Sequence, residues 1–250
     1  MYNPFSLSNK VVLVTGASSG IGRATAVECS RMGATVYITG RDERRLVETM
    51  SLMDHSDKHK VIVADLSSLE QLDNLVNLVD SKLDGVVQCA GFANPKPFQY
   101  LSIEDIDAIM GVNYKAPIML SRNLIKKKKV NKNGSIVFIS SISGVYISSV
   151  GGSLYSGSKG AINGFVKGMA IELASKSIRV NCVNPGMIDT NIFDTGTVTG
   201  EQLAEDAKRY PLGRYGKPEE VGHAVVYLLS DASLWVTGTN LLIDGGYTLL

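Results

Sequence analysis

The sequence has few of the residues that cross-link secreted proteins or anchor membrane proteins. Three cysteines occur among 250 residues, none in a C-x-x-C pair, and a chain this long can bury a core without disulfides or structural zinc. No run of about 18 apolar residues is present, and residues 1–9 lack the basic and apolar regions of a signal peptide. We therefore expect a cytoplasmic protein that does not enter a membrane.

An excess of charge of either sign is also missing. The chain carries 25 Lys and Arg against 24 Asp and Glu, whereas proteins that wrap nucleic acid need many cations to displace counterions. Histidine is scarce, and His55 and His59 lie four apart in a polar segment that we expect to be a loop without a metal. Proline is sparse and no low-complexity stretch divides the chain, so we expect one domain over residues 1–250 and no nucleic-acid partner.

What the sequence does have is a regular alternation of short apolar segments and longer helical ones. The short segments are rich in β-branched residues and almost wholly apolar, as in strands whose sheet is covered by helices on both faces. Helix starts are indicated by Ser67-x-x-Glu70, by Ser102 and by Pro218. These patterns predict a doubly wound α/β fold with a seven-stranded parallel sheet. The expected strands are residues 11–15, 35–39, 61–64, 85–89, 135–140, 179–183 and 240–243.

A glycine-rich turn directly follows the first expected strand. Residues 15–22 are Thr-Gly-Ala-Ser-Ser-Gly-Ile-Gly, and a helical pattern continues over 23–32. In this order of strand, turn and helix, glycines let the backbone approach a pyrophosphate, whose charge then meets free N–H groups at the positive helix end. An ordinary tight turn is the alternative. The residues expected to bind a dinucleotide here are Gly16, Ser18, Ser19, Gly20, Ile21 and Gly22.

The end of the second expected strand bears on which dinucleotide binds. An acidic side chain there would hold a ribose 2′-hydroxyl, and an arginine would pair with a 2′-phosphate. Gly40 cannot repel a phosphate and Arg41 follows it, so the sequence favours NADP(H), with NAD(H) as the alternative. Asp42 could hold the 2′-hydroxyl, although it suits the N-cap of the next helix better. Asp65, beside Leu66, is either an adenine contact or a turn residue.

A tyrosine and a lysine lie one helical turn apart in the second half of the chain. Tyr155 and Lys159 belong to a helical pattern that runs to about residue 175, so the phenol and the ammonium share one face. A neighbouring cation favours the phenolate of a tyrosine and suits it to proton transfer. Ser141 closes the fifth strand, where the ligand crevice of such folds opens, and can hydrogen-bond the reacting oxygen.

In these motifs the sequence resembles the short-chain dehydrogenase/reductase family, in the short form that includes 3-oxoacyl-[acyl-carrier-protein] reductases, over essentially the whole chain. The family's glycine motif and its catalytic serine, tyrosine and lysine fall on the residues named above. Its helix asparagine falls on Asn113, for which the resemblance implies an ordered water and a proton relay from Lys159. The resemblance also implies cofactor contacts by Tyr155 and Lys159, and by Ala90, Gly91, Pro185, Gly186, Ile188 and Thr190. Among these, it implies that Ile188 and Thr190 contact the nicotinamide carboxamide.

The resemblance implies a Rossmann fold, a homotetramer and an NADP(H)-dependent oxidoreductase. Such an enzyme interconverts a ketone or 3-oxoacyl group with a secondary alcohol by hydride transfer, with Tyr155 as general acid and base. Residues 191–211 predict a substrate lid, with Phe193, Tyr146 and Ile147 as apolar walls or as core residues. Lys126 to Lys129 and Lys132 form either a solvated helix end or a docking patch for an acidic acyl carrier.

One position departs from the family pattern, and two other classes of protein compete. The family has Asn-Asn-Ala-Gly where this chain has Gln88, Cys89, Ala90 and Gly91, so the lost asparagine leaves the rigidity of the central strand open. Cys89 as a reactive thiol is the alternative at this position. A catalytically silent nucleotide-binding regulator and an S-adenosylmethionine methyltransferase share the start of the fold, but neither accounts for the tyrosine and lysine pair.

Overall fold

The computed structural model describes residues 2–190 and 200–250, and in it seven strands form one parallel sheet. The strand order is β3-β2-β1-β4-β5-β6-β7, which confirms the doubly wound fold. The order reverses between β1 and β4, and a crevice opens at such a point beyond the carboxyl ends of the strands. The strands are β1 Val11–Thr15, β2 Thr35–Gly40, β3 Lys60–Val63, β4 Leu83–Gln88, β5 Val130–Ile139, β6 Arg179–Pro185 and β7 Asn240–Ile243.

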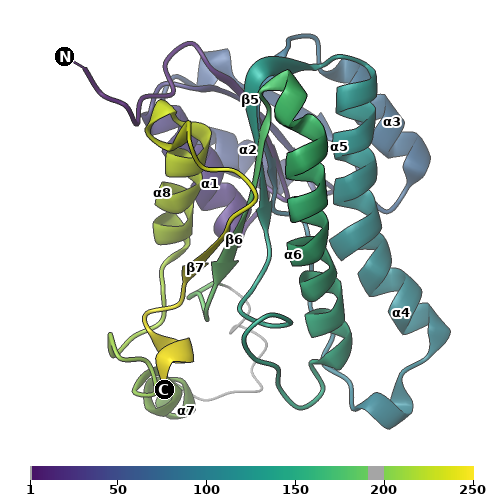
Figure 1. Cartoon of the computed structure of the whole chain (residues 1–250), viewed down its shortest axis with the longest axis vertical. Helices are drawn as coiled ribbons and strands as arrows, with labels where there is room; N and C mark the ends of the chain where they lie inside the picture. The colour runs from purple at the N-terminus through teal and green to yellow at the C-terminus, as the bar shows by residue number, and fades with distance from the viewer. Residues whose placement is uncertain (1, 191–199) are drawn as a thin grey trace.

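Helices cover both faces of the sheet (Figure 1). α1 (Gly20–Arg31), α2 (Glu43–Ser51) and α8 (Pro218–Leu229) pack on one face, and α7 (Gly200–Ala207) lies beyond the carboxyl ends. The other face holds α3 (Leu69–Leu78), α4 (Ile103–Met110), α5 (Ala116–Lys126) and α6 (Ser153–Leu173). Val12 and Val14 enter one buried cluster and Leu13 the other, which explains why the strands lack polar alternation.

Two helix starts agree with the sequence patterns and one does not. Ser102 accepts the N–H of Asp105 at 3.3 Å, and the Asp105 carboxylate accepts the N–H of Ser102 at 2.9 Å, which completes a capping box. Pro218 begins α8 as expected. The cap of α3, however, is Ser68 rather than Ser67. Asp65 accepts both the N–H and the hydroxyl of Ser67, at 2.9 and 2.8 Å, so this local turn moves the cap along by one residue.

The polar loop expected around His55 and His59 is only partly correct. His59 is 8% exposed, its Nδ1 accepts the N–H of Val36 at 3.1 Å, and its Nε2 lies 2.7 Å from the Asp54 carbonyl. Because Nδ1 accepts, the ring proton is on Nε2 and the histidine joins β2 to the loop before β3. Over residues 2–190 and 200–250, no cluster of His, Cys, Asp or Glu is suited to a metal ion, and no helix is long and apolar enough to cross a bilayer.

Candidate active site

β1 leads into the glycine turn, where the backbone comes close to the end of β4. Gly16 has φ +65°, and a Cβ at this position would lie 2.9 Å from the backbone of Ala90. A Cβ on Gly22 would lie 2.2 Å from the Gly16 carbonyl oxygen, so only glycine fits at either position. α1 begins at Gly20, with no side-chain cap from Ser19 and no acidic residue in its first turn. The positive end of this helix is therefore open to an anion.

Thr190 faces the turn from the opposite side of the crevice. Its methyl carbon would lie 3.4 Å from a Cβ on Gly20, and its buried hydroxyl has no hydrogen-bond partner among the described residues. A buried hydroxyl of this kind destabilises the fold unless a ligand or water supplies a partner. The close glycine backbone, the uncapped helix end and the unpaired hydroxyl together fit the diphosphate of a dinucleotide.

The end of β2 lies against a serine, and an arginine follows it. A Cβ on Gly40 would lie 3.4 Å from the Ser18 hydroxyl, and Arg41 is exposed next to it. Asp42 accepts the N–H of Arg45 at 3.1 Å and caps α2, as expected. The N–H of Ser67, followed by its hydroxyl and the charge of Arg41, holds the pKa of Asp65 below its usual range despite partial burial. Asp65 is thus an ionised turn residue that lies within reach of the charge of Arg41.

Lys159 lies against the end of β5 with Tyr155 one turn before it on α6. Lys159 is 6% exposed, and its ammonium donates to the Ile139 carbonyl at 2.8 Å and lies 5.7 Å from the centroid of the Tyr155 ring. Ser141 follows β5, and its hydroxyl oxygen accepts the N–H of Ser143 at 3.1 Å. The hydroxyl proton of Ser141 is therefore free for a ligand. Among the described residues the Tyr155 hydroxyl makes no hydrogen bond.

Asn113 joins this site to the chain after β4. Its amide donates to the Phe92 carbonyl at 2.9 Å and to the Ser158 hydroxyl at 3.1 Å, and its oxygen accepts the N–H of Phe92 at 3.0 Å. A Cβ on Gly91 would lie 3.1 Å from that oxygen and 3.5 Å from the Lys159 nitrogen. Gly91, Asn113 and Lys159 thus come together beside the nucleotide turn.

A π turn over Gly111–Lys115 sets the backbone of Asn113 apart from α4 and α5. In an α-helix the Asn113 carbonyl would accept from residue 117, but that residue is Pro117 and has no N–H. The helix is therefore irregular before the proline, over the π turn. Such a turn loosens the normal pattern of hydrogen bonds around the Asn113 carbonyl.

A layer of buried amides behind these residues was not expected. The Asn163 amide donates to the Ser140 hydroxyl and to the Lys159 carbonyl, both at 2.8 Å. The Asn184 amide donates to the Ser141 carbonyl at 2.8 Å and to the Asn163 oxygen at 2.9 Å. These bonds fix β5, β6 and α6 relative to each other. The available signal was the presence of both Asn181 and Asn184 in β6, because asparagine is uncommon in strands.

Gln88 takes over part of the anchoring that the family assigns to the missing asparagine. Its side-chain amide donates to the Pro117 carbonyl at 3.3 Å and to the Ser121 hydroxyl at 3.1 Å, which ties β4 to α5. The Thr15 hydroxyl oxygen accepts the N–H of Cys89 at 3.0 Å. Burial raises the pKa of the Cys89 thiol to about 12, so the thiolate that a nucleophile needs is disfavoured.

The loop after β6 carries the last group of expected contacts. The N–H of Gly186 donates to the Ile243 carbonyl at 3.1 Å, and a Cβ on Gly186 would lie 3.0 Å from Asp244. Ile188 is 8% exposed and pairs with Gly216 in an isolated bridge. The loop that follows Pro185 is thus held from two sides, with Thr190 at its end.

The expected lid falls only partly within the structure. Residues 191–199, which include Phe193, lie outside the described residues. α7, Gly200–Ala207, lies in the second half of the expected lid. Tyr146 is 44% exposed, which contradicts a core position and leaves it available to a ligand, and Ile147 is partly buried.

Comparison with known proteins identifies relatives of this chain. A family model described as enoyl-(acyl carrier protein) reductase matches residues 16–248. The 3-oxoacyl-[acyl-carrier-protein] reductase of Rickettsia bellii is 35% identical over 244 residues, which are 98% of this chain and 99% of that one. The chain belongs to the short-chain dehydrogenase/reductase family.

Other members show how widely the family's substrates vary. A tropinone reductase homolog of Arabidopsis thaliana is 37% identical over 252 residues, 98% of this chain and 94% of that one. A solved structure from Beutenbergia cavernae with bound NADP has a TM-score of 0.89 and 31% identity, and covers 99% of this chain and 100% of that one. This short-chain dehydrogenase/reductase is therefore an oxidoreductase that acts on CH–OH and C=O groups.

Proposed function

We propose that this protein, as a single domain over residues 1–250, interconverts a ketone or 3-oxoacyl group and a secondary alcohol with NADP(H). The observation that carries the proposal is the buried Lys159 ammonium beside the Tyr155 ring at the carboxyl end of β5. The glycine turn and the uncapped start of α1 lie at the same edge of the sheet. A proton donor and a dinucleotide cradle therefore open onto one crevice.

Tyr155 is the general acid for reduction and the general base for the reverse reaction. Its hydroxyl protonates the carbonyl oxygen, while the free proton of Ser141 donates a hydrogen bond to that oxygen as charge develops. Lys159 favours the phenolate left on Tyr155 because its ammonium is close and largely shielded from water. The proton returns to Tyr155 along a path through Lys159 and the Asn113 backbone. A reduced nicotinamide, when bound, supplies the hydride.

NADP(H) is the coenzyme that the end of β2 favours. Gly40 has no side chain to repel a phosphate beside Ser18, and the exposed guanidinium of Arg41 is suited to a 2′-phosphate. Asp42 uses one carboxylate oxygen to cap α2 and is less available to a 2′-hydroxyl. Ser18 and Arg41 would hold the phosphate. NAD(H) would bind more weakly because it gives Arg41 no anionic partner.

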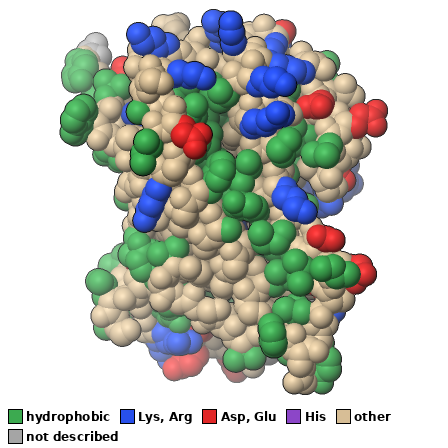
Figure 2. All heavy atoms as spheres, turned by 45° about the vertical axis from the view of Figure 1, so that its right-hand side comes forward, with side chains coloured by type: hydrophobic (Ala, Val, Ile, Leu, Met, Phe, Trp, Pro, Cys, Tyr) green, Lys and Arg blue, Asp and Glu red, His purple; other side chains and the backbone are tan. Residues whose placement is uncertain are grey.

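One form of the proposed substrate is linked to an acyl carrier. The basic patch of Lys126 to Lys129 and Lys132, where such a carrier would dock, lies at the far end of the sheet from Ser141. Lys126 closes α5 and Lys129 precedes β5, whereas Ser141 follows β5. Lys127 donates to Asn77 and Lys129 to the Val79 carbonyl, so two of these cations already have partners. Figure 2 shows Lys and Arg side chains gathered at this end of the molecule. A free ketone or thioester therefore fits the site of a single chain more simply than a carrier docked on this patch.

We further propose a cytoplasmic homotetramer, as the family resemblance implies. Apolar side chains lie exposed on the face shown in Figure 2. On α4 and α6, Ile103, Ile106 and Ile171 are 63, 39 and 78% exposed. Exposed apolar residues that gather on one face mark an association surface. Light scattering coupled to gel filtration should give four times the chain mass, and a monomer would refute this part of the proposal.

The test of function is a comparison of coenzymes followed by a substrate panel. NADPH should raise the melting temperature more than NADH at equal concentration, since a ligand that binds only the folded state stabilises it by mass action. NADPH oxidation should then appear with at least one member of a panel of ketones and 3-oxoacyl thioesters, free and carrier-linked. Tight NADPH binding without turnover across the panel would favour the silent regulator.

A further inference from the structure

The segment after α7 contacts the loop after β6 through the side chain of Tyr210 and the backbone of Gly216. Tyr210 is 5% exposed, and its phenol oxygen accepts the backbone N–H of Met187 at 3.2 Å. Met187 lies between Gly186 and Ile188, in the loop whose Ile188 and Thr190 the family resemblance assigns to the nicotinamide. The carbonyl of Met187 accepts the N–H of Gly216 at 3.0 Å. The N–H of Met187 thus has a side-chain acceptor, whereas its carbonyl has a backbone donor.

Two further aromatic rings hold Tyr210 in place. Its ring stacks on Tyr247 with centroids 4.6 Å apart and 30° between the planes, and meets Tyr215 edge-on at 5.5 Å and 88°. The guanidinium of Arg209 lies 5.4 Å from the centroid of Tyr247. Burial raises the pKa of Tyr210, so its phenol stays neutral at working pH and acts as an uncharged acceptor.

The C-terminal turn fixes Tyr247 in turn. The Asp244 carboxylate follows β7 and accepts the N–H of Gly246 at 3.0 Å, the N–H of Thr248 at 2.8 Å and the Thr248 hydroxyl at 2.7 Å. A Cβ on Gly246 would lie 3.0 Å from Pro211, the residue after Tyr210. Figure 1 shows α7 and the C-terminus next to each other beyond the ends of β6 and β7. Three segments far apart in the sequence therefore meet at Tyr210.

We infer that Tyr210 is a positioning residue for the nicotinamide half of the coenzyme site. By accepting the N–H of Met187, its phenol sets where the backbone of residues 186–188 stands relative to the crevice. The inference rests on the proposed function, because the family resemblance behind that proposal assigns Ile188 and Thr190 of this loop to the nicotinamide. Phenylalanine at position 210 would keep the aromatic packing and remove only the acceptor, which leaves the Met187 N–H unpaired.

The test compares Tyr210→Phe with Tyr215→Phe as a matched control. Tyr215→Phe removes a phenol of the same cluster, one that donates to Asp206 at 2.8 Å and not to Met187. Hydrogen exchange followed by mass spectrometry, without nucleotide, should show the Met187 amide exchanging about tenfold faster in Tyr210→Phe and unchanged in the control. This measurement reports the contact independently of any activity.

Affinity then separates positioning from a general structural role. NADPH and 2′-phospho-ADP-ribose, a fragment without the nicotinamide, are titrated against each variant. Tyr210→Phe should weaken NADPH about fivefold to tenfold and leave the fragment within about twofold of wild type. If Tyr210→Phe fails to fold, Tyr247→Leu, which removes the stacked ring and keeps the phenol, should show the same selective loss at about threefold.

Each outcome decides a different claim. Unchanged exchange at Met187, or equal loss of affinity for NADPH and the fragment, overturns the assignment of Tyr210. The same holds if Tyr247→Leu, used in its place, binds NADPH as wild type does. A wild-type chain that binds neither ligand refutes the proposed function. A wild type that binds both, with a Tyr210→Phe variant identical to it, refutes the role of Tyr210 alone.

Discussion

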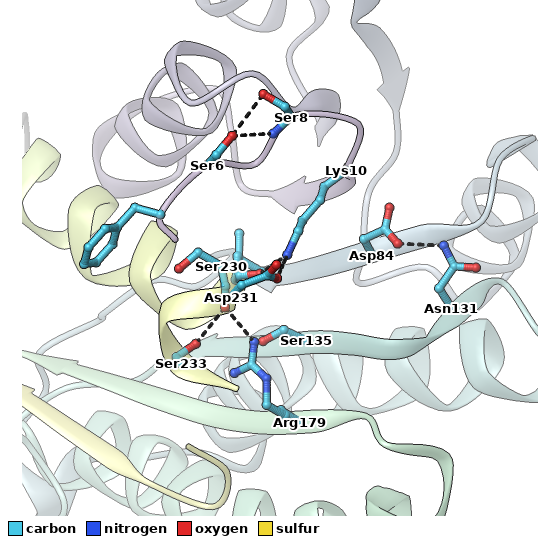
Figure 3. Close-up of polar contacts among 12 residues, drawn as sticks. Ser6, Ser8, Lys10, Asp84, Asn131, Ser135, Arg179, Ser230, Asp231 and Ser233 are labelled. Atoms are coloured by element: carbon cyan, nitrogen blue, oxygen red, sulfur yellow. Dashed lines mark hydrogen bonds and ion pairs between the residues drawn. The ribbon is translucent and has the colours of Figure 1, made fainter. Parts of the chain in front are cut away.

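The two ends of the sheet treat buried polar groups in different ways. At the amino ends of the strands, Arg179 is 7% exposed and donates to the Leu228 carbonyl at 2.7 Å and the Val236 carbonyl at 3.3 Å. The region around Arg179 also holds the ion pair of Lys10 with Asp231 at 2.6 Å (Figure 3). At the carboxyl ends, Lys159 has one hydrogen bond from its ammonium and Tyr155 has none from its hydroxyl, counted over the described residues.

This difference separates stability from function. Side chains at the amino end bond mainly to groups of the same region, as where Asp84 accepts the N–H of Val11 at 2.9 Å and the amide of Asn131 at 2.7 Å (Figure 3). The Nε of Arg179 is an exception, because it is buried without a partner among the described residues. Groups at the carboxyl end keep donors and acceptors for a ligand. Changes at the amino end should therefore lower the free energy of unfolding without altering the reaction. Changes at the carboxyl end should alter the reaction and leave the free energy of unfolding nearly unchanged.

Tyr155→Phe should have the largest effect, and on turnover alone. Loss of the proton donor removes general acid catalysis, which contributes about 10²- to 10⁴-fold, so we expect kcat to fall about 10³-fold. Dissociation constants for NADPH and the melting temperature should stay close to wild type. Steady-state kinetics with the best ketone of the panel provides the measurement. A variant as fast as wild type would remove Tyr155 from the mechanism.

Arg179→Met should have the largest effect on stability. The substitution keeps much of the side-chain volume and leaves the Leu228 and Val236 carbonyls without their charged donor. We expect a loss of about 2 to 4 kcal/mol in the free energy of unfolding, from urea denaturation, with kcat per folded molecule unchanged. A drop in kcat without a loss of stability would break the division between the two ends.

Arg41→Ser should change coenzyme choice without changing chemistry. If Arg41 pairs with the 2′-phosphate, its removal should raise the KM for NADPH about tenfold and leave the KM for NADH within about twofold. The value of kcat should be nearly unchanged with either coenzyme. The opposite result, a selective loss with NADH, would mean that the end of β2 recognises a 2′-hydroxyl.

Asp80→Asn should give the smallest effect, at the amino end, and the effect should be present near neutral pH and vanish in acid. A hydrogen bond from the Lys60 ammonium, and then one from the Tyr37 phenol, lowers the pKa of Asp80 to about 2. A carboxylate whose pKa is lower in the folded state stabilises the fold above its unfolded pKa of about 4, and this contribution disappears as the pH falls towards 2. The melting temperature of wild type should therefore fall more steeply over this range than that of Asp80→Asn. Parallel curves would show that Asp80 contributes nothing.

The sequence predicted those features that depend on local pattern. Strands buried on both faces are apolar throughout, the glycine turn has a fixed place after β1, and Asp42 suits a cap, so each was visible before the fold. Ser67 was a wrong cap because Asp65 competes for its N–H and hydroxyl. The burial of His59 and the contact of Tyr210 with Met187 join segments 23 residues apart, and no local pattern indicates such pairings.

The most direct test of the account follows the hydride. NADPH that carries two deuterium atoms at C4 of the nicotinamide is used to reduce the best ketone of the panel, and the alcohol is analysed by mass spectrometry. The account predicts one deuterium on the carbinol carbon with wild type, and the same product at about a 10³-fold lower rate with Tyr155→Phe. An alcohol without deuterium, or an equal rate for both proteins, would contradict it.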